Sequence, residues 1–102
     1  MELTYGRYLK VEELLQLQQP LSEGPEHDEM LFIIIHQVYE LWFKQILHEL
    51  EKLKSSFQEG ERGKALHTLK RIRSILKVLV SQVDVLETMT PLEFLSFRER
   101  LQ

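Results

Sequence analysis

The side chain with the most evident chemical capacity in this sequence is the imidazole of His36. On a helix, positions three, four and seven residues away share one face. For His36 these neighbours are mostly aromatic or apolar: Phe32, Ile33, Tyr39, Glu40 and Phe43. Such a water-poor wall favours a neutral ring that can approach an apolar ligand or a metal centre. The pattern alone still favours a simpler interpretation, a core histidine hydrogen-bonded to Glu40 or to the backbone.

Arg98 is the second candidate. It follows Phe94 by four residues and Phe97 by one, so its stem is expected along an aromatic face. An arginine placed in this way can bind a carboxylate through two parallel hydrogen bonds in a partly dry site. Spacing alone favours a surface ion pair with Glu93 or Glu99 instead.

The remaining titratable groups offer weaker signals. Surface positions are favoured for His48 and His67, which lie among charged and amide side chains, and His27 has no motif around it. No histidine belongs to a Glu-x-x-His pair of the kind that binds two irons in a helical bundle. Zinc-protease, phosphate-loop and hydrolase motifs are also absent. The basic residues within 70–77 are interpreted as a solvated outer face.

The element that must position His36 is a long helix. Residues 28–58 contain neither proline nor glycine, and acidic residues at their start favour a helix N-terminus. Residues 30–43 include eleven apolar side chains in fourteen, so we expect protein or a cofactor to cover this stretch on nearly all sides. In the second half, Glu49 is expected to face water, opposite an apolar face made by Ile46, Leu50, Leu53 and Phe57.

The other elements are also predicted to be helical. Residues 11–18 read as a short amphipathic helix after an extended or irregular segment 3–6, and residues 20–25 as a linker. Glycines at 60 and 63 are expected to break the chain. A bundle seam then follows with steps of three and four: Leu66, Leu69, Ile72, Leu76, Leu79, Val83 and Leu86. A last helix should begin at Thr90 and stop at Gln102 without a stop signal, as if cut within the helix.

Composition limits the fold class and the partners. The chain has 102 residues, 43% of them hydrophobic, which predicts one domain spanning 1–102. Because the sequence shows no strand alternation, we expect this domain to be all-α, with two long antiparallel helices and shorter elements packed across them. A net charge of −3 disfavours nucleic acid as a partner. The absence of cysteine excludes disulfides, thiolate zinc sites and iron–sulfur clusters. The first residues lack a secretory signal and no stretch is long enough to span a bilayer, so a cytoplasmic location is expected.

Three strings of the sequence carry a resemblance to a known family. LTYGRYLKVEELLQLQ, HDEMLFIIIHQVYELWFKQILHELE and MTPLEFLSFRERL, in this order, closely resemble the amino-terminal part of the tryptophan 2,3-dioxygenases. The likeness covers nearly the whole chain, and the central string, with its histidine in an aromatic stripe, makes it specific. It implies an all-α, homotetrameric enzyme that uses the iron of haem b and dioxygen to convert L-tryptophan to N-formylkynurenine, which opens the kynurenine pathway.

The resemblance also implies roles for individual residues. His36 matches the histidine that lies above the haem and hydrogen-bonds the indole N–H, and Phe32 matches a phenylalanine of the indole pocket. Arg98 matches the arginine that binds the substrate carboxylate, with Phe94 at the pocket position one turn earlier. Three residues match those that reach into the active site of a neighbouring protomer: Tyr5, Tyr8 and Leu9.

One element of the family pattern has no counterpart in this sequence. The family's axial haem ligand is a histidine from a later helix, and none of His27, His48 and His67 matches it. We therefore expect the chain to be the amino-terminal part of such an enzyme, not retaining haem and not active by itself. The alternative is a non-catalytic, oligomeric helical domain of vestigial dioxygenase ancestry, with residues 30–43 buried against a partner subunit.

Overall fold

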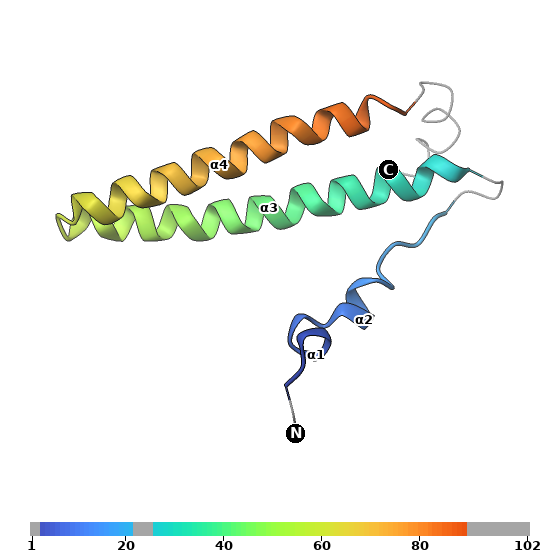
Figure 1. The fold of residues 1–102 in the computed structure, drawn as a ribbon, viewed down its shortest axis with the longest axis horizontal. Helices are drawn as coiled ribbons and strands as arrows, with labels where there is room; N and C mark the ends of the chain where they lie inside the picture. The colour runs from blue at the N-terminus through green and yellow to red at the C-terminus, as the bar shows by residue number, and fades with distance from the viewer. Residues whose placement is uncertain (1–2, 22–25, 90–102) are drawn as a thin grey trace.

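The structure, a computed structural model, describes residues 3–21 and 26–89, and every regular element in these ranges is an α-helix. The helices are α1 (Tyr5–Leu9), α2 (Val11–Leu14), α3 (His27–Gln58) and α4 (Arg62–Leu86). Helices α3 and α4 lie side by side as an antiparallel hairpin, and α1 and α2 belong to an arm that leads away from it (Figure 1). The all-α prediction is confirmed. The helix predicted from Thr90 lies outside the described residues.

The long helix α3 begins and ends close to its predicted limits. Asp28 and Glu29 occupy its first turn, where the helix dipole favours negative charge. The chain reverses at Gly60, whose φ of 71° is easily reached only without a side chain. The predicted break at Gly63 is wrong, because this residue lies in the first turn of α4, where its missing Cβ costs little.

The two long helices meet along heptad-spaced faces, but the face of α4 is not the predicted one. Its buried residues are Ala65, Thr68, Ile75 and Leu79. Of the predicted seam, Leu79 is buried, whereas Leu66, Leu69 and Leu76 remain 54%, 44% and 48% exposed. The sequence has two adjacent stripes, and the one with small side chains at 65 and 68 allows the backbones to approach near the turn.

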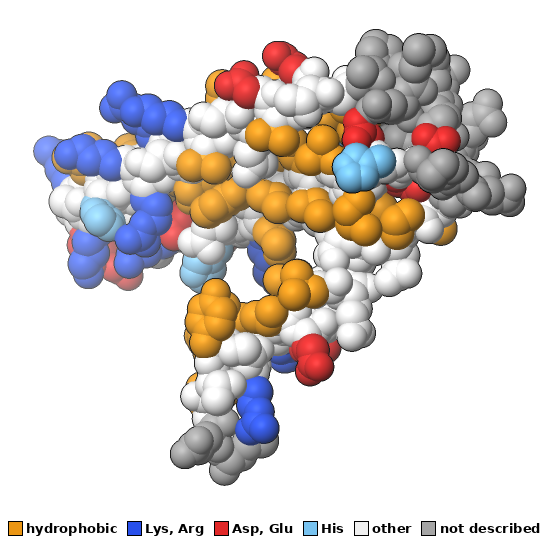
Figure 2. All heavy atoms as spheres, turned by 45° about the vertical axis from the view of Figure 1, so that its right-hand side comes forward, with side chains coloured by type: hydrophobic (Ala, Val, Ile, Leu, Met, Phe, Trp, Pro, Cys, Tyr) orange, Lys and Arg blue, Asp and Glu red, His pale blue; other side chains and the backbone are white. Residues whose placement is uncertain are grey.

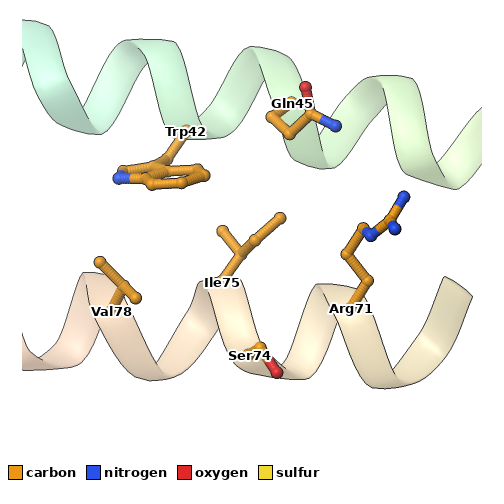
Figure 3. Close-up of a pocket in the computed structure, with 6 residues that line it drawn as sticks. All are labelled: Trp42, Gln45, Arg71, Ser74, Ile75 and Val78. Carbon is orange, nitrogen blue, oxygen red and sulfur yellow. The ribbon is translucent and has the colours of Figure 1, made fainter.

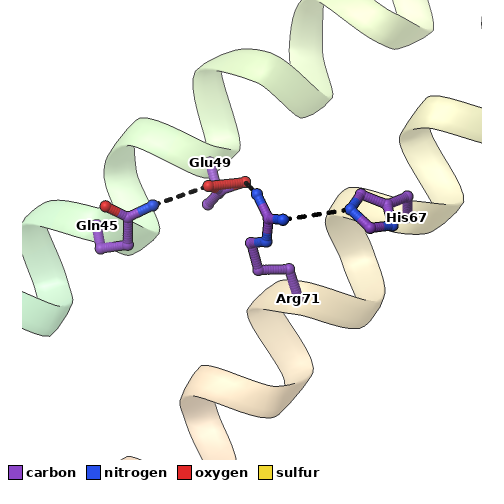
Figure 4. A network of polar contacts seen from close by, with 4 residues as sticks. All are labelled: Gln45, Glu49, His67 and Arg71. Atoms are coloured by element: carbon purple, nitrogen blue, oxygen red, sulfur yellow. Dashed lines mark hydrogen bonds and ion pairs between the residues drawn. The ribbon is translucent and has the colours of Figure 1, made fainter.

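Glu49 is a second correction, since it was expected to face water and is only 4% exposed. Its Oε2 accepts a hydrogen bond of 2.8 Å from Gln45 Nε2, and its Oε1 lies 3.5 Å from Arg71 Nη1 on α4. Figure 4 shows these contacts, together with a 3.4 Å contact between Arg71 Nη2 and His67 Nε2. The carboxylate is buried because a cation from the facing helix reaches it, which the spacing within α3 alone did not reveal.

The amino-terminal arm, defined here as residues 3–21, differs from its predicted secondary structure. Residues 5 and 6, expected to be irregular, are helical in α1, because the hydroxyl of Thr4 accepts a hydrogen bond from Arg7 N and caps the helix. The helix expected over 11–18 ends at Leu14, whose carbonyl accepts a hydrogen bond from Gln18 Nε2. Lys10, with a φ of 55°, separates α1 from α2.

Much apolar surface of the hairpin stays uncovered within the described residues. Hydrophobic side chains form a band along the hairpin in Figure 2. In the stretch 30–43, which was expected to be covered on nearly all sides, Met30, Ile34, Leu41 and Phe43 are 39–55% exposed. The part of the chain that the structure describes does not supply this cover. No described helix has the length and apolar character needed to cross a membrane.

Candidate functional site

The aromatic stripe predicted around His36 is present on α3. The rings of Phe32 and His36 stack with their centroids 4.2 Å apart and their planes inclined by 31°. Tyr39 meets His36 edge-on at 6.4 Å and continues to Phe43 at 6.1 Å. Because Tyr39 also donates a hydrogen bond of 2.8 Å to the carbonyl of Leu79, the stripe is attached to α4 at its centre. The structure thus brings Phe32 and His36 together.

The hydrogen bond of His36 determines which ring nitrogen is available. Nδ1 lies 2.7 Å from the carbonyl oxygen of Phe32. A carbonyl can only accept, so Nδ1 carries the proton of this bond. In the neutral ring Nε2 is then an acceptor, pointing away from the backbone. The histidine therefore offers one fixed acceptor to a donor such as an N–H group. The backbone bond of the simpler interpretation is formed, whereas a bond to Glu40 is not observed.

The predicted dry surroundings of His36 are not formed by the described residues, and the imidazole is exposed. The reason is its angular position on α3. Tyr39 points towards α4, and His36, three residues earlier, lies at the outer edge of the helix contact. Phe32 covers one face of the imidazole ring. Groups other than the described residues would have to cover the rest of the ring.

A groove adjoins His36 on the side of the arm. It has a volume of about 460 Å³, and its walls come from two elements. Leu14 and Leu17 line it from the arm, while the lining residues of α3 are His36, Gln37, Glu40, Leu41 and Lys44. The imidazole is thus at the border between an apolar groove and solvent, a position from which it can meet a ligand that enters from outside.

A second pocket, of about 380 Å³, lies between α3 and α4 (Figure 3). Trp42 of α3 and the apolar side chains of Ile75 and Val78 of α4 point towards one another in it. Its cation, Arg71, is already paired with Glu49. No described histidine or carboxylate lines this pocket, so it offers less chemistry than the groove beside His36.

The other predicted site residues are not assembled around His36. Tyr5, Tyr8 and Leu9 lie on α1, are 79%, 70% and 46% exposed, and belong to a helix that among the described elements contacts only α2. Arg98 and Phe94 lie outside the described residues. Gln37 was not recognised as a site residue. The available signal was an amide directly after His36 in an otherwise apolar stretch.

The surroundings of His36 suit a flat apolar group on one side. An open imidazole next to stacked aromatic rings suits one face of a flat apolar ring system. Within the described ranges, no group of three or more His, Cys, Asp or Glu side chains could hold a metal ion. His48 and His67 are exposed, as predicted, and His67 contacts Arg71. The described residues therefore suit contact with one face of a flat apolar ring system.

The fold and the site define a class, a helical hairpin that presents a histidine and an aromatic stripe on an incompletely covered face. A tryptophan 2,3-dioxygenase family profile matches residues 1–102. Tryptophan 2,3-dioxygenase of Herpetosiphon aurantiacus is 61% identical over 98% of this chain, and that of Dictyostelium discoideum is 49% identical over 95%. The chain belongs to the tryptophan 2,3-dioxygenase family. It spans 38% and 26% of the lengths of these two relatives.

Proposed function

We propose that this chain supplies the distal and carboxylate-binding side of a haem-dependent tryptophan 2,3-dioxygenase. The reaction joins dioxygen to L-tryptophan and gives N-formylkynurenine, the first step of the kynurenine pathway. The observation that carries the proposal is the pairing of His36 with Phe32. The Phe32 carbonyl holds the proton on Nδ1, so an uncovered Nε2 is left as an acceptor in an aromatic stripe.

The residues of this chain bind and orient the substrate. Nε2 of His36 accepts the indole N–H, and Phe32 supports both the imidazole and the indole ring. We assign Arg98 to binding of the substrate carboxylate and Phe94 to the same pocket. These two assignments rest on family membership. A substrate without the carboxylate would leave the guanidinium without its partner, at a cost of about 1–3 kcal/mol.

Haem b is the cofactor of this proposal, and when bound it supplies the iron that reacts with dioxygen. His36 and Phe32 would face it. We assign none of His27, His48 and His67 as a ligand of the iron. The task of His36 is positioning and electrostatic, because its single acceptor fixes the indole without requiring that the imidazole remove the proton.

The arm supports a homotetrameric enzyme with shared active sites. Tyr5, Tyr8 and Leu9 are exposed on α1 and do not pack on the hairpin of their own chain. Exposed aromatic side chains on a projecting element suit insertion into another subunit. We assign these three residues to the substrate pocket of a neighbouring protomer.

The proposal is tested in a full-length enzyme that carries this segment as its amino-terminal part. We expect His36→Ala to lower kcat/KM for tryptophan at least about tenfold, and Arg98→Ala to raise KM by about a hundredfold. His48→Ala is the matched control, because His48 lies on the same helix and is exposed outside the groove. Kinetics of the two site variants equal to those of the control would refute the proposal.

The uncovered apolar surface favours a second candidate, a non-catalytic oligomeric helical domain. Large apolar side chains such as Leu47 and Val80 are 64% and 71% exposed, an arrangement typical of subunit contacts. Hemin added to the 102-residue chain tests the second candidate. A specific haem spectrum that His36→Ala abolishes excludes it. A helical oligomer without a Soret shift is expected under both candidates, and the kinetics of the full-length variants then decide between them.

A further inference from the structure

The arm is attached to the hairpin through two amide side chains. Nε2 of Gln37, on α3, donates a hydrogen bond of 3.0 Å to the carbonyl of Leu17 in the arm. Oε1 of Gln37 accepts a hydrogen bond of 2.9 Å from Nε2 of Gln18. The amide of Gln18 also donates to the carbonyl of Leu14, the last residue of α2. One side chain of α3 is thereby connected to the end of α2.

A second attachment of the arm lies further along the chain, at Leu21. The backbone N–H of Leu21 donates a hydrogen bond of 2.8 Å to Oε2 of Glu29, in the first turn of α3. Glu29 is only 4% exposed, whereas Leu21 is 58% exposed, so the bond is partly buried. The segment between Leu17 and Leu21 is thus held at both ends by polar side chains of α3.

Packing between helices contributes little to this attachment. Neither α1 nor α2 has a helix contact with α3 or α4 in the described part of the chain, and neither contains a buried residue. Figure 1 shows the arm leaving the hairpin rather than lying along it. The direction in which the arm projects therefore depends on the bonds of Gln37 and Glu29 and on the contacts that form the groove.

We propose that Gln37 is a positioning residue, which sets the direction of the arm and thereby the place where Tyr5, Tyr8 and Leu9 enter a neighbouring active site. It follows His36 directly, and both line the groove closed by Leu14 and Leu17. The helix that presents the distal histidine of one site thus also aims the arm that completes another. This inference rests on the proposed function.

The chemistry requires an amide at position 37. A glutamine offers a donor and an acceptor on one planar group, and both are used here, towards Leu17 and from Gln18. Glutamate would keep the acceptor but place a carboxylate against the Leu17 carbonyl. Leucine has a similar size and helix propensity and removes both bonds. The two variants therefore separate loss of one bond from loss of both.

Distance measurements between two spin labels test the geometry directly. The chain has no cysteine, so Glu12→Cys and Glu51→Cys provide exposed label sites on the arm and on α3. We expect a narrow distance distribution in the parent chain and one at least about twofold wider with Gln37→Leu. Gln37→Glu should fall between them, and adding Gln18→Ala to Gln37→Leu should cause little further widening.

Gln45→Leu is the matched control for this measurement. Gln45 is also a half-buried amide of α3, but it bonds to Glu49 and not to the arm. It should leave the distance distribution unchanged. Circular dichroism confirms that each variant keeps its helices. If a folded Gln37→Leu chain gave the parent distribution, or if Gln45→Leu widened it equally, the proposal would be overturned.

The role in catalysis has its own readout. In the full-length enzyme, we expect Gln37→Leu and Tyr8→Ala each to raise KM for tryptophan about fivefold with kcat changed by less than about twofold, because the proposal places the arm against the substrate. The spin-label measurement needs neither haem nor tryptophan. A widened distribution with unchanged KM would therefore overturn the positioning role while leaving the proposed function to the His36 and Arg98 variants.

Discussion

The hairpin and the arm are held in place by different interactions. The hairpin has buried residues on both helices, and those of α4 extend from Ala65, near the turn, to Leu79. The arm has no buried residue in either of its helices and is connected through hydrogen bonds of side chains. Among the described residues, the side chains proposed for chemistry lie on the arm and on the edge of the hairpin that faces it.

Because of this difference, we expect stability and assembly of the site to respond to different substitutions. Substitutions in the hairpin contact should change the free energy of unfolding, whereas substitutions in the arm should change how a site is completed and leave that free energy nearly constant. His36 belongs to both regions, since its helix is fixed by the hairpin and its ring faces the groove beside the arm.

The largest effect on stability is expected from Leu79→Ala. Leu79 is 8% exposed in the helix contact, and removal of its side chain leaves a cavity, at a cost of about 2–3 kcal/mol. Val80, the next residue, is 71% exposed, so Val80→Ala serves as the control and should cost less than about 0.5 kcal/mol. Urea unfolding followed by circular dichroism measures both. Similar losses of stability in the two variants would contradict the assignment of Leu79, and not Val80, to the helix contact.

A smaller effect is expected from Arg71→Ala. This change leaves the carboxylate of Glu49, 4% exposed, without the cation that lies 3.5 Å from it. Because the side chain of Arg71 is 51% exposed and solvent screens it, we expect a loss of about 1 kcal/mol. Arg73→Ala, two residues away and exposed, should have no measurable effect. Arg71→Ala should lose less stability in a chain that already carries Glu49→Gln. If it lost as much there as in the parent chain, the pairing with Glu49 would not be the cause of the loss.

The hydroxyl of Tyr39 allows the two regions to be compared with one chemical change. Tyr39→Phe removes the hydrogen bond to the Leu79 carbonyl and should cost about 0.5–1 kcal/mol. Tyr8→Phe, in the arm, should leave the unfolding free energy unchanged, because Tyr8 is 70% exposed. Equal costs at the two positions would show that the arm is packed as firmly as the hairpin.

The limits of α3 could be predicted from the sequence because they depend on local features. Residues 28–58 lack proline and glycine, acidic residues favour the start, and Gly60 provides the positive φ of the turn. The helix contact could not be predicted in the same way. The stripes through Leu69 and through Thr68 are adjacent on α4, and only packing against α3 decides between them. Glu49 is buried for the same reason.

The candidate site was predictable in its chemistry but not in its surroundings. Spacing on α3 correctly placed Phe32 beside His36, since neighbours on one helix are fixed by its geometry. Burial of the imidazole depends on groups from other elements, and the described residues supply only the groove wall of Leu14 and Leu17. The role of Gln37 depends on hydrogen bonds to residues about twenty positions away. No local sequence pattern predicts such bonds.

The smallest effect is expected at the turn, where a carboxylate cluster lies outside both the helix contact and the arm. A hydrogen bond with Glu61 and the like charge of that residue raise the pKa of Glu59 in the folded chain. The charged form of Glu59 is therefore disfavoured by folding, so stability is gained as this group is protonated and lost as pH rises through its raised folded pKa. Glu59→Gln should raise Tm at pH 7 by no more than about 1–2 °C.

The pH dependence of that gain identifies its origin. At pH 3 Glu59 is largely protonated in the parent chain, so the advantage of Glu59→Gln should disappear there. Glu61 behaves in the opposite sense, because its hydrogen bond with Lys64 lowers its pKa, and Glu61→Gln should lower Tm at pH 7. Thermal unfolding at the two pH values measures both variants. A gain for Glu59→Gln that persists or grows in acid would show that helix propensity near the turn, and not charge, is responsible.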